Sequence, residues 1–322
     1  MIDVQRLRVL RSVAEHGSFN RAATALHLTP SAVSQHIAAL ERSLGAPVVD
    51  RSTRGVTLTQ AGRIMVGAAE SVAAELAYAA REIDRLGTAR GRLTIATFTS
   101  GGQHLLPGAL THVTAAHPGT VVHVREAEPE DSLPLLRQGT VDVALAYHFD
   151  APLPRLRGPG PAVEWIPLME DPLHVVLPEP HPLAARPVLN LAELADEPWV
   201  LGCLKTEAYL RRYAEHAGFS PDVRGSTTDY FFARSLVAAG VGLSLIPTVA
   251  LTPPLPGVRA VPLEAPTPSR HIGVAVLHRP GRPEVSTLIE ALRQYAEAGA
   301  AASDGVATTP RPADEAGKAP TA

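Results

Sequence analysis

Cysteine is nearly absent from this sequence, since Cys203 is the single thiol among its 322 residues. One thiol excludes an internal disulfide framework and any zinc module built from several cysteines. Aromatic residues amount to only 4%, so the hydrophobic cores must be built mainly from Ala, Val, Leu and Ile. The 13 histidines show no metal-ligand spacing such as HExxH. We therefore expect neither a metal nor another cofactor.

Long apolar runs and enzyme motifs are also missing. The longest apolar candidate, residues 235–247, is broken by glycines and is shorter than the roughly 18 residues that a membrane-spanning helix needs. The start, MIDVQRLRVLRSV, lacks the apolar segment and cleavage site of a secretory signal. No GxSxG, GxxxxGK(S/T) or strand-following GxGxxG occurs. We expect a cytoplasmic protein with no membrane partner and no enzymatic activity.

The charge of the chain is distributed unevenly. The whole sequence carries a formal net charge of −3, but residues 1–65 carry +4 and the remainder carries −7. This asymmetry indicates a basic, partner-binding piece attached to a neutral or acidic body. At about 150 residues per domain, the length suggests two domains.

Two short helices are indicated within residues 18–45, which read SFNRAATALHLTPSAVSQHIAALERSLG. Ser18 can cap the first helix, and Thr29 followed by Pro30 marks the start of the second, where proline's missing N–H costs nothing. Gly45 stands where a left-handed residue ends that helix. Its inward stripe is Val33, Ile37, Leu40 and Leu44. Two helices joined by a short turn make a helix-turn-helix, whose second helix enters the major groove of DNA.

The opposite face of the second helix is polar, with Ser31, Ser34 and Gln35. Such side chains reach phosphates and base edges, and Gln can address adenine with two hydrogen bonds. A two-stranded wing, PVVDRSTRGVTLTQAG, follows and presents Arg51 and Arg54 to phosphate or to the minor groove. The alternative is a small helical domain with a solvated basic face. The capped helix, the polar face and the basic wing together favour DNA binding.

Residues 59–86 form one long, alanine-rich helical pattern. Its apolar stripe is Ala61, Met65, Ala68, Val72, Leu76, Ala79, Ile83 and Leu86. A helix of about 28 residues is about 42 Å long, too long to pack only on a small N-terminal domain. An ordinary amphipathic helix is the alternative. We favour pairing with the same helix of a second copy, because no other partner for the stripe lies nearby.

The body of the chain alternates strand patterns with helical patterns. Strands are predicted at 93–98, 120–126, 141–147, 173–179, 199–202, 242–247 and 271–279, and helices at 103–116, 206–217, 229–239 and 285–298. This alternation implies two α/β lobes with a mostly parallel sheet. The last residues, 299–322, are small, polar and proline-bearing, and are expected to form a disordered tail.

The N-terminal stretches SFNRAATALHLTPSAVSQHIAALERSLG and DRSTRGVTLTQAGR resemble those of the LysR-type transcriptional regulators. The body is similar to theirs in EDPLHVVLPEPHPLA (170–184) and LVAAGVGLSLIP (236–247). The resemblance implies a winged helix-turn-helix, a long linker helix and a two-lobed α/β effector domain like a periplasmic binding protein. The DNA contacts it implies are Thr29, Pro30, Ser31, Ser34, Gln35, Arg51 and Arg54.

The same resemblance, together with the composition of the segments, gives the expected domain boundaries. The DNA-binding domain is expected over 1–58, the linker or dimerisation helix over 59–90, and the effector-binding domain over 91–298. Within the effector domain, lobe 1 is expected to take about 91–163 and 268–298, and lobe 2 about 164–267.

A ligand of such a body binds in the cleft at the carboxyl ends of its strands. The first candidate segment follows strand 93–98 and opens a helix, with Thr99, Ser100, Gly101 and Gln103. Exposed N–H groups at a helix start favour an anion, although a plain helix cap is the alternative. In similar regulators the residue matching Ser100 contacts the carboxylate of the inducer.

Three further features belong to this cleft. Glu128 stands where relatives often have a small residue, and it lies either in a solvated loop or in a position that selects a cationic effector. The second lobe offers Gly202, Thr228 and Phe231 at strand and helix edges. Cys203 in the same region could sense oxidants, but without a second cysteine a buried, inert thiol is favoured.

We therefore predict a ligand-responsive regulator that binds double-stranded promoter DNA as a homodimer or homotetramer and takes a small-molecule effector. The alternative is a small-molecule-binding or enzymatic α/β protein of the cytoplasm whose N-terminal domain only mediates association. Salt-dependent binding to an operator would separate the two.

Overall fold

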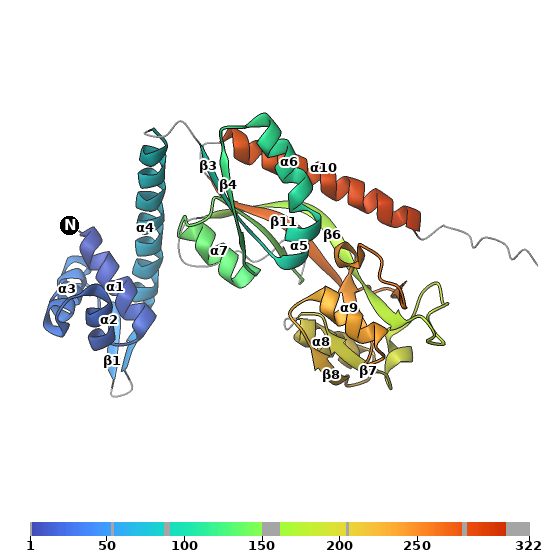
Figure 1. Ribbon diagram of the computed structural model, residues 1–322. Coiled ribbons are helices and arrows are strands. Elements are labelled where there is room, and N and C mark those ends of the chain that lie inside the picture. The colour runs from blue at the N-terminus through green and yellow to red at the C-terminus, as the bar shows by residue number, and fades with distance from the viewer. Residues whose placement is uncertain are drawn as a thin grey trace, which may run out of the picture.

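The computed structural model describes residues 2–52, 55–86, 91–149, 162–203, 206–278 and 282–306. Three parts follow one another along the chain: a small helical head, one long helix and a two-lobed α/β body (Figure 1). In the described part of the chain, no helix has both the length and the apolar character that crossing a bilayer requires.

The head contains three helices and a hairpin. Its elements are α1 (Val4–His16), α2 (Phe19–Leu26), α3 (Pro30–Leu44), β1 (Val49–Ser52) and β2 (Gly55–Leu58), the last two pairing antiparallel. The expected caps are present: the side chain of Ser18 accepts from the backbone N–H of Arg21, and that of Thr29 accepts from Ala32. The stripe of Val33, Ile37 and Leu40 is fully buried in the core of the head.

Helix α4 (Gln60–Leu86) leaves the head as one uninterrupted rod (Figure 1). Val66 and Ala69 pack into the core of the head. Farther along the same helix Leu76 and Ile83 are 57% and 66% exposed. The apolar stripe predicted from the sequence therefore extends well beyond anything that this chain packs against it.

Lobe 1 is built around parallel strands. It contains β3 (Arg92–Thr97), α5 (Thr99–His104), α6 (Leu106–Ala116), β4 (Val121–Glu126), α7 (Pro129–Arg137) and β5 (Val143–His148). Strand β3 lies between β4 and β5 and is parallel to both, as the strand–helix alternation predicted. One face of this sheet packs on α5, α6 and the returning helix α10 (Pro283–Val306), and α7 covers the other.

Lobe 2 follows. It holds β7 (Pro198–Leu201), α8 (Thr206–His216), β8 (Asp222–Ser226), α9 (Tyr230–Ala238), β9 (Ser244–Pro247) and β10 (Val258–Pro262), with short 3₁₀ helices η1 (Leu191–Leu194) and η2 (Thr248–Leu251). Its core surrounds Trp199, which is completely buried.

Two long strands connect the lobes. Strand β6 (Val163–Pro178) pairs along its first part with β11 (Ser269–Leu277) and along its second part with β9 and β10. Thus β6 carries the chain into lobe 2, and β11 brings it back to lobe 1. The change of lobe occurs within β6, later than the boundary expected at residue 163, because Trp165 and Ile166 still pack in lobe 1.

Several elements differ from the sequence-based predictions. Helix α7 begins at Pro129, in a segment interpreted as a loop, and β8, β10 and the first part of β6 were not predicted. Helix α10 continues to Val306, past the start expected for a disordered tail, because the three consecutive alanines at 300–302 favour a helix. Residues 307–322 lie outside the described part.

Candidate DNA-reading surface and effector pocket

The outer face of α3 is available to a partner. Ser31 and Gln35 are exposed and Ser34 is half-buried, while the opposite stripe fills the core. At the start of the helix the Thr29 hydroxyl accepts from the backbone of Ala32 at 3.2 Å and lies 3.0 Å from the Ser31 hydroxyl. Thr29 and Pro30 are themselves exposed. The structure thus presents short polar groups at the N-terminal end of a helix, where recognition helices contact DNA.

Arg51 extends this face from the wing. Its guanidinium lies 4.5 Å from the ring centre of Phe19 in α2 and donates to the Ser34 hydroxyl at 3.4 Å. Among the described residues no carboxylate forms an ion pair with Arg51, which is exposed. A cation is therefore held beside α3 with its charge uncompensated. Arg54, the second predicted wing contact, lies outside the described residues.

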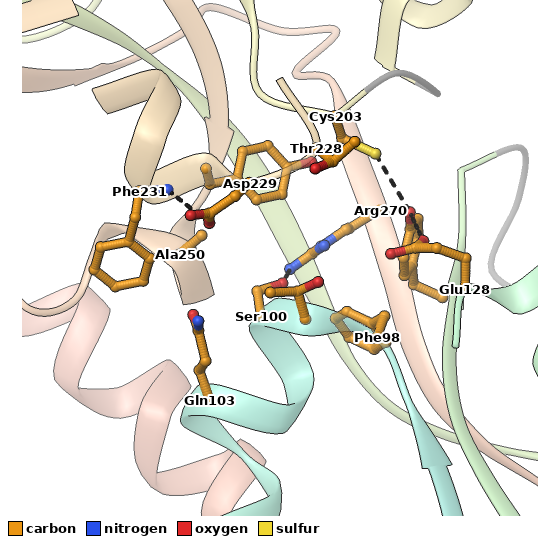
Figure 2. A pocket seen from close by; sticks show the side chains of 13 residues that line it. Phe98, Ser100, Gln103, Glu128, Cys203, Thr228, Asp229, Phe231, Ala250 and Arg270 are labelled. Carbon is orange, nitrogen blue, oxygen red and sulfur yellow. Dashed lines mark hydrogen bonds between the residues drawn. The ribbon is translucent and has the colours of Figure 1, made fainter. Parts of the chain in front are cut away.

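A pocket between the two lobes brings together most of the predicted effector-binding residues (Figure 2). Its lining contains the predicted Thr99, Ser100, Gln103, Glu128, Cys203, Thr228 and Phe231, and also Phe98, Tyr147, Asp229, Tyr230, Ala250 and Arg270. The free volume is about 10 Å³, which is room for about one water molecule. The lobes therefore close tightly on this site.

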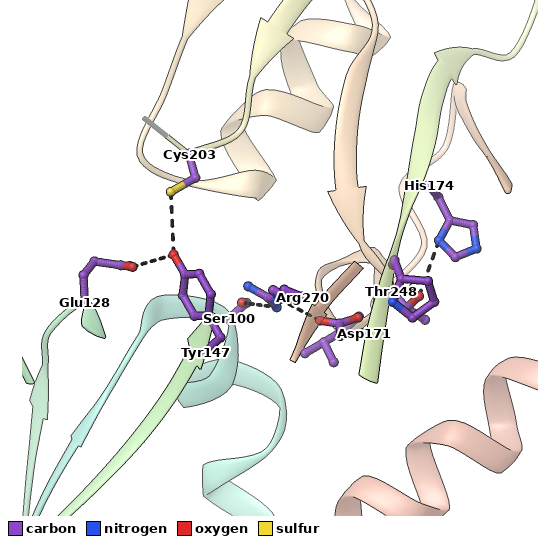
Figure 3. Close-up of polar contacts among 10 residues, drawn as sticks. Ser100, Glu128, Tyr147, Asp171, His174, Cys203, Thr248 and Arg270 are labelled. Atoms are coloured by element: carbon purple, nitrogen blue, oxygen red, sulfur yellow. Dashed lines mark hydrogen bonds and ion pairs between the residues drawn. The ribbon is translucent and has the colours of Figure 1, made fainter. Parts of the chain in front are cut away.

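A buried ion pair with its hydrogen-bond partners lies at the floor of the pocket. Arg270 on β11 donates to Asp171 on β6 at 2.8 Å and to the Ser100 hydroxyl at 2.9 Å (Figure 3). Asp171 also accepts from the backbone N–H of Val249 in η2 at 3.0 Å. The side chains of Arg270 and Asp171 are 1% and 0% exposed. Burial acts to lower the pKa of Arg270, but the attraction of Asp171 outweighs it, and the pKa is raised.

A second group of polar contacts includes the Cys203 thiol. The Tyr147 hydroxyl donates to the Glu128 carboxylate at 2.7 Å and lies 4.0 Å from the Cys203 sulfur (Figure 3). Burial, reinforced by the neighbouring Cys203 and Glu128, raises the pKa of Tyr147, so its hydroxyl stays protonated and acts as a donor. Cys203 is half-buried and lines the pocket. The expectation that this thiol is buried is therefore wrong, while its expected inertness stays a prediction.

Aromatic contacts hold the lobes together around the pocket. His104 of α5 stacks on Phe231 of α9 with ring centres 6.1 Å apart, and Phe149 packs on Tyr209 of α8 at 4.0 Å. Burial, and then the positive charges of Arg234 and Arg270, lower the pKa of His104. The neutral ring therefore forms this interlobe contact at pH 7.

Gly101 and Gly202 do not line the pocket, in contrast to the prediction. A Cβ atom at Gly101 would lie 2.7 Å from the Phe98 ring, and one at Gly202 would lie 2.4 Å from the Tyr230 ring. These glycines are therefore required for the close packing of two aromatic rings that do line the pocket. Glu128 lies at the start of α7 and not in a solvated loop.

The lining residues that sequence reasoning missed come mainly from distant strands. Arg270 had one detectable signal, since it is an arginine at the start of a strand that is apolar from Ile272 onward. Tyr147 ends a predicted parallel strand, a position that commonly faces a ligand. Asp229 and Tyr230 belong to the segment expected at the second-lobe edge, but nothing in the local sequence distinguished them. In the described part of the chain, no group of His, Cys, Asp and Glu side chains could hold a metal ion.

A helix-turn-helix head with an open polar face, joined to two lobes that enclose a small pocket, defines a ligand-responsive DNA-binding regulator. Residues 4–63 match the model of the "bacterial regulatory helix-turn-helix protein, lysR family", and residues 86–297 match that of the "LysR substrate binding domain". The chain belongs to the LysR family. It is a transcriptional regulator and not an enzyme, which excludes the enzymatic alternative.

The chain is also similar to individual regulators of this family, two of them curated proteins and one a solved structure. The DNA-binding transcriptional dual regulator OxyR of Escherichia coli K12 is 30% identical over 311 residues, covering 94% of this chain and 97% of OxyR. A probable hydrogen peroxide-inducible genes activator of Mycobacterium avium is 31% identical over 286 residues, covering 86% and 88%. A cysteine-to-serine mutant of Corynebacterium glutamicum OxyR, solved with hydrogen peroxide bound, is 26% identical, with a TM-score of 0.57 over 96% of this chain and 99% of that one.

Proposed function

We propose that this chain is a peroxide-responsive LysR-type regulator whose reactive group is the Cys203 thiol. The observation that carries the proposal is the position of that thiol, in a pocket with free volume for about one water molecule. A ligand the size of hydrogen peroxide fits such a space, whereas a metabolite requires the lobes to open. The relationship to peroxide-inducible activators supports the same ligand.

Polar groups around the thiol suit an oxygen ligand. Ser100 accepts from Arg270 through its oxygen, which leaves its own hydroxyl proton available to a bound molecule. The Arg270 charge is balanced by Asp171, so the pocket floor is polar without a net attraction for a large anion. Thr99, Gln103, Glu128, Thr228 and Phe231 complete the walls.

The proposed reaction is a two-electron oxidation of sulfur. The Cys203 thiolate forms a bond to one peroxide oxygen, the O–O bond breaks, and the other oxygen leaves as hydroxide and takes up the proton that the thiol had released. The products are a sulfenic acid and water. Since the sequence contains no second cysteine, the oxidised chain cannot close an internal disulfide.

The added oxygen changes the contact between the lobes. Cys203 follows β7 in lobe 2, whereas Tyr147 and Glu128 belong to lobe 1. The S–OH oxygen lies where the sulfur now faces the Tyr147 hydroxyl across the lobes, and replacing that contact favours a state with a different lobe closure. A ligand-driven shift between two such states is the way a sensor domain alters the heads attached to it.

On the DNA side, we propose that α3 lies in the major groove with Ser31, Ser34 and Gln35 toward the bases. Thr29, Pro30, Arg51 and Arg54 contact the backbone. The exposed stripe of α4 pairs with a second copy, which places two heads on two half-sites of a promoter in the cytoplasm.

The test is mass spectrometry of the reduced protein after treatment with hydrogen peroxide and a sulfenic-acid trap such as dimedone. The wild type is expected to carry the adduct on Cys203, while Cys203→Ser carries none and no longer changes its promoter binding with peroxide. An unmodified wild-type thiol, or a Cys203→Ser protein that still responds, would overturn the proposal.

A further inference from the structure

The Tyr230 hydroxyl is buried, and its oxygen has no hydrogen-bond partner among the described residues. The side chain is 7% exposed, so water does not substitute freely for that partner. Buried hydroxyl groups in folded proteins are nearly always hydrogen-bonded, and an exception calls for an explanation. Tyr230 also lines the pocket that contains Cys203.

The ring of Tyr230 is held firmly in place. It stands at the first position of α9, directly after Asp229, whose carboxylate caps the helix by accepting from Phe231 at 3.0 Å. One side of the ring packs against Gly202, where no side chain could fit. The Arg270 guanidinium lies 5.9 Å from the ring centre. The position of the hydroxyl is therefore fixed before any ligand arrives.

Three other buried or half-buried hydroxyl groups of the pocket lining already form hydrogen bonds within the chain. Tyr147 donates to Glu128, Thr99 donates to Glu126 at 2.6 Å, and Ser100 accepts from Arg270. Tyr230 instead contributes a hydroxyl donor to the lining that it shares with Cys203, and that hydroxyl has no acceptor among the described residues. Burial raises the pKa of Tyr230, so the group keeps its proton and remains a donor.

We propose that Tyr230 binds the oxygen that enters this pocket: its hydroxyl donates a hydrogen bond to the departing oxygen of hydrogen peroxide and afterwards to the sulfenic oxygen on Cys203. This role rests on the proposed peroxide response. Negative charge develops on the departing oxygen as the O–O bond breaks, and a donor fixed at that position stabilises it. Tyr230 gives no proton away, because hydroxide recovers the proton released by the thiol.

The experiment compares the full-length wild type with Tyr230→Phe, which removes a single oxygen atom. The second-order rate constant for Cys203 oxidation by hydrogen peroxide is expected to fall on the order of 10- to 100-fold. Alkylation of the same thiol by iodoacetamide, which expels iodide and needs no oxygen-binding group, is expected to stay within about twofold. The matched control is Tyr295→Phe, because Tyr295 is an exposed tyrosine of α10 outside the pocket.

A second variant tests the geometry without removing the hydroxyl. Gly202→Ala places a methyl group where the Tyr230 ring now lies. The ring is expected to be displaced, so oxidation of Cys203 by peroxide slows. Tyr230→Phe, by contrast, is expected to keep a melting temperature near that of the wild type.

The outcomes separate the two proposals. Equal peroxide rates for wild type and Tyr230→Phe overturn the role of Tyr230 and leave the peroxide response intact. An equal loss of peroxide and iodoacetamide reactivity shows that Tyr230 acts on the thiol itself, and it also overturns the proposed oxygen-binding role of Tyr230. If the wild-type thiol does not react with peroxide at all, the proposed function itself fails.

Discussion

Replacing Asp171 by Asn tests the buried ion pair that joins the lobes. The substitution keeps the shape of the side chain and an acceptor for Val249, but it removes the charge that compensates Arg270, 2.8 Å away and 1% exposed. Leaving a buried charge without its partner costs about 3–5 kcal/mol of unfolding free energy. For a domain of about 200 residues, each kcal/mol lowers the melting temperature by about 2–4 °C. The expected decrease is therefore roughly 6–20 °C.

Tryptophan fluorescence follows the thermal unfolding of the two-lobed body, because Trp165 and Trp199 both lie in that body. The matched control is Glu207→Gln, which breaks the exposed pair of Glu207 with Arg211, at 2.7 Å, within α8. An exposed pair of this kind contributes about 0.3–0.5 kcal/mol, so the control should melt within about 2 °C of the wild type. A decrease in Asp171→Asn no larger than that of the control would refute the reasoning.

Three further predictions concern DNA binding, pH and assembly. Gln35→Ala should cost about 1–3 kcal/mol at one operator base pair and little elsewhere; gel shifts with a set of operator variants check this, and an unchanged preference for every variant contradicts it. Because burial, Arg234 and Arg270 lower the pKa of His104 below 6.5, the folded state binds its proton less readily, and the stability it contributes above pH 6.5 is lost as the pH falls through the folded pKa. His104→Phe should therefore flatten the fall of melting temperature in acid, and an unchanged pH profile would show that the contact does not titrate. Leu76→Glu, which places a charge on the exposed stripe of α4, should reduce the assembly by at least one oligomeric step in analytical ultracentrifugation without lowering the melting temperature of the body, whereas an unaltered sedimentation profile would remove α4 from the interface.

Local sequence signals were sufficient to predict α2, α3 and the wing of the head, whereas α1 was not predicted. Each helix start and stop has its own residue, such as Ser18, Thr29–Pro30 and Gly45, and each acts within one turn of the chain. The outward Ser and Gln side chains of α3 then follow from helical periodicity. The same periodicity predicted α4 to within a residue of its observed start.

The pocket could be predicted only in part, because its chemistry depends on pairs that are far apart in the sequence. Asp171 and Arg270 are separated by 99 positions, and no periodic pattern links them. Ser100 and Cys203 were recognisable from their places at strand and helix ends. The enclosed position of Tyr230 was not, because burial at the first turn of a helix depends on how the lobes close.

The paired strands β6 and β11 determine how the body can move. Arg270 and Asp171 are direct neighbours across this antiparallel ladder, at the level where the chain leaves one lobe for the other. Despite a register shift between Ile272 and Gly273, the ladder resists sliding, since translation would break its backbone hydrogen bonds together, but it tolerates bending and twisting. Strain arising at the thiol would thus reach the rest of the molecule as a change in sheet twist, and the sheet would bend at the buried Arg270–Asp171 ion pair.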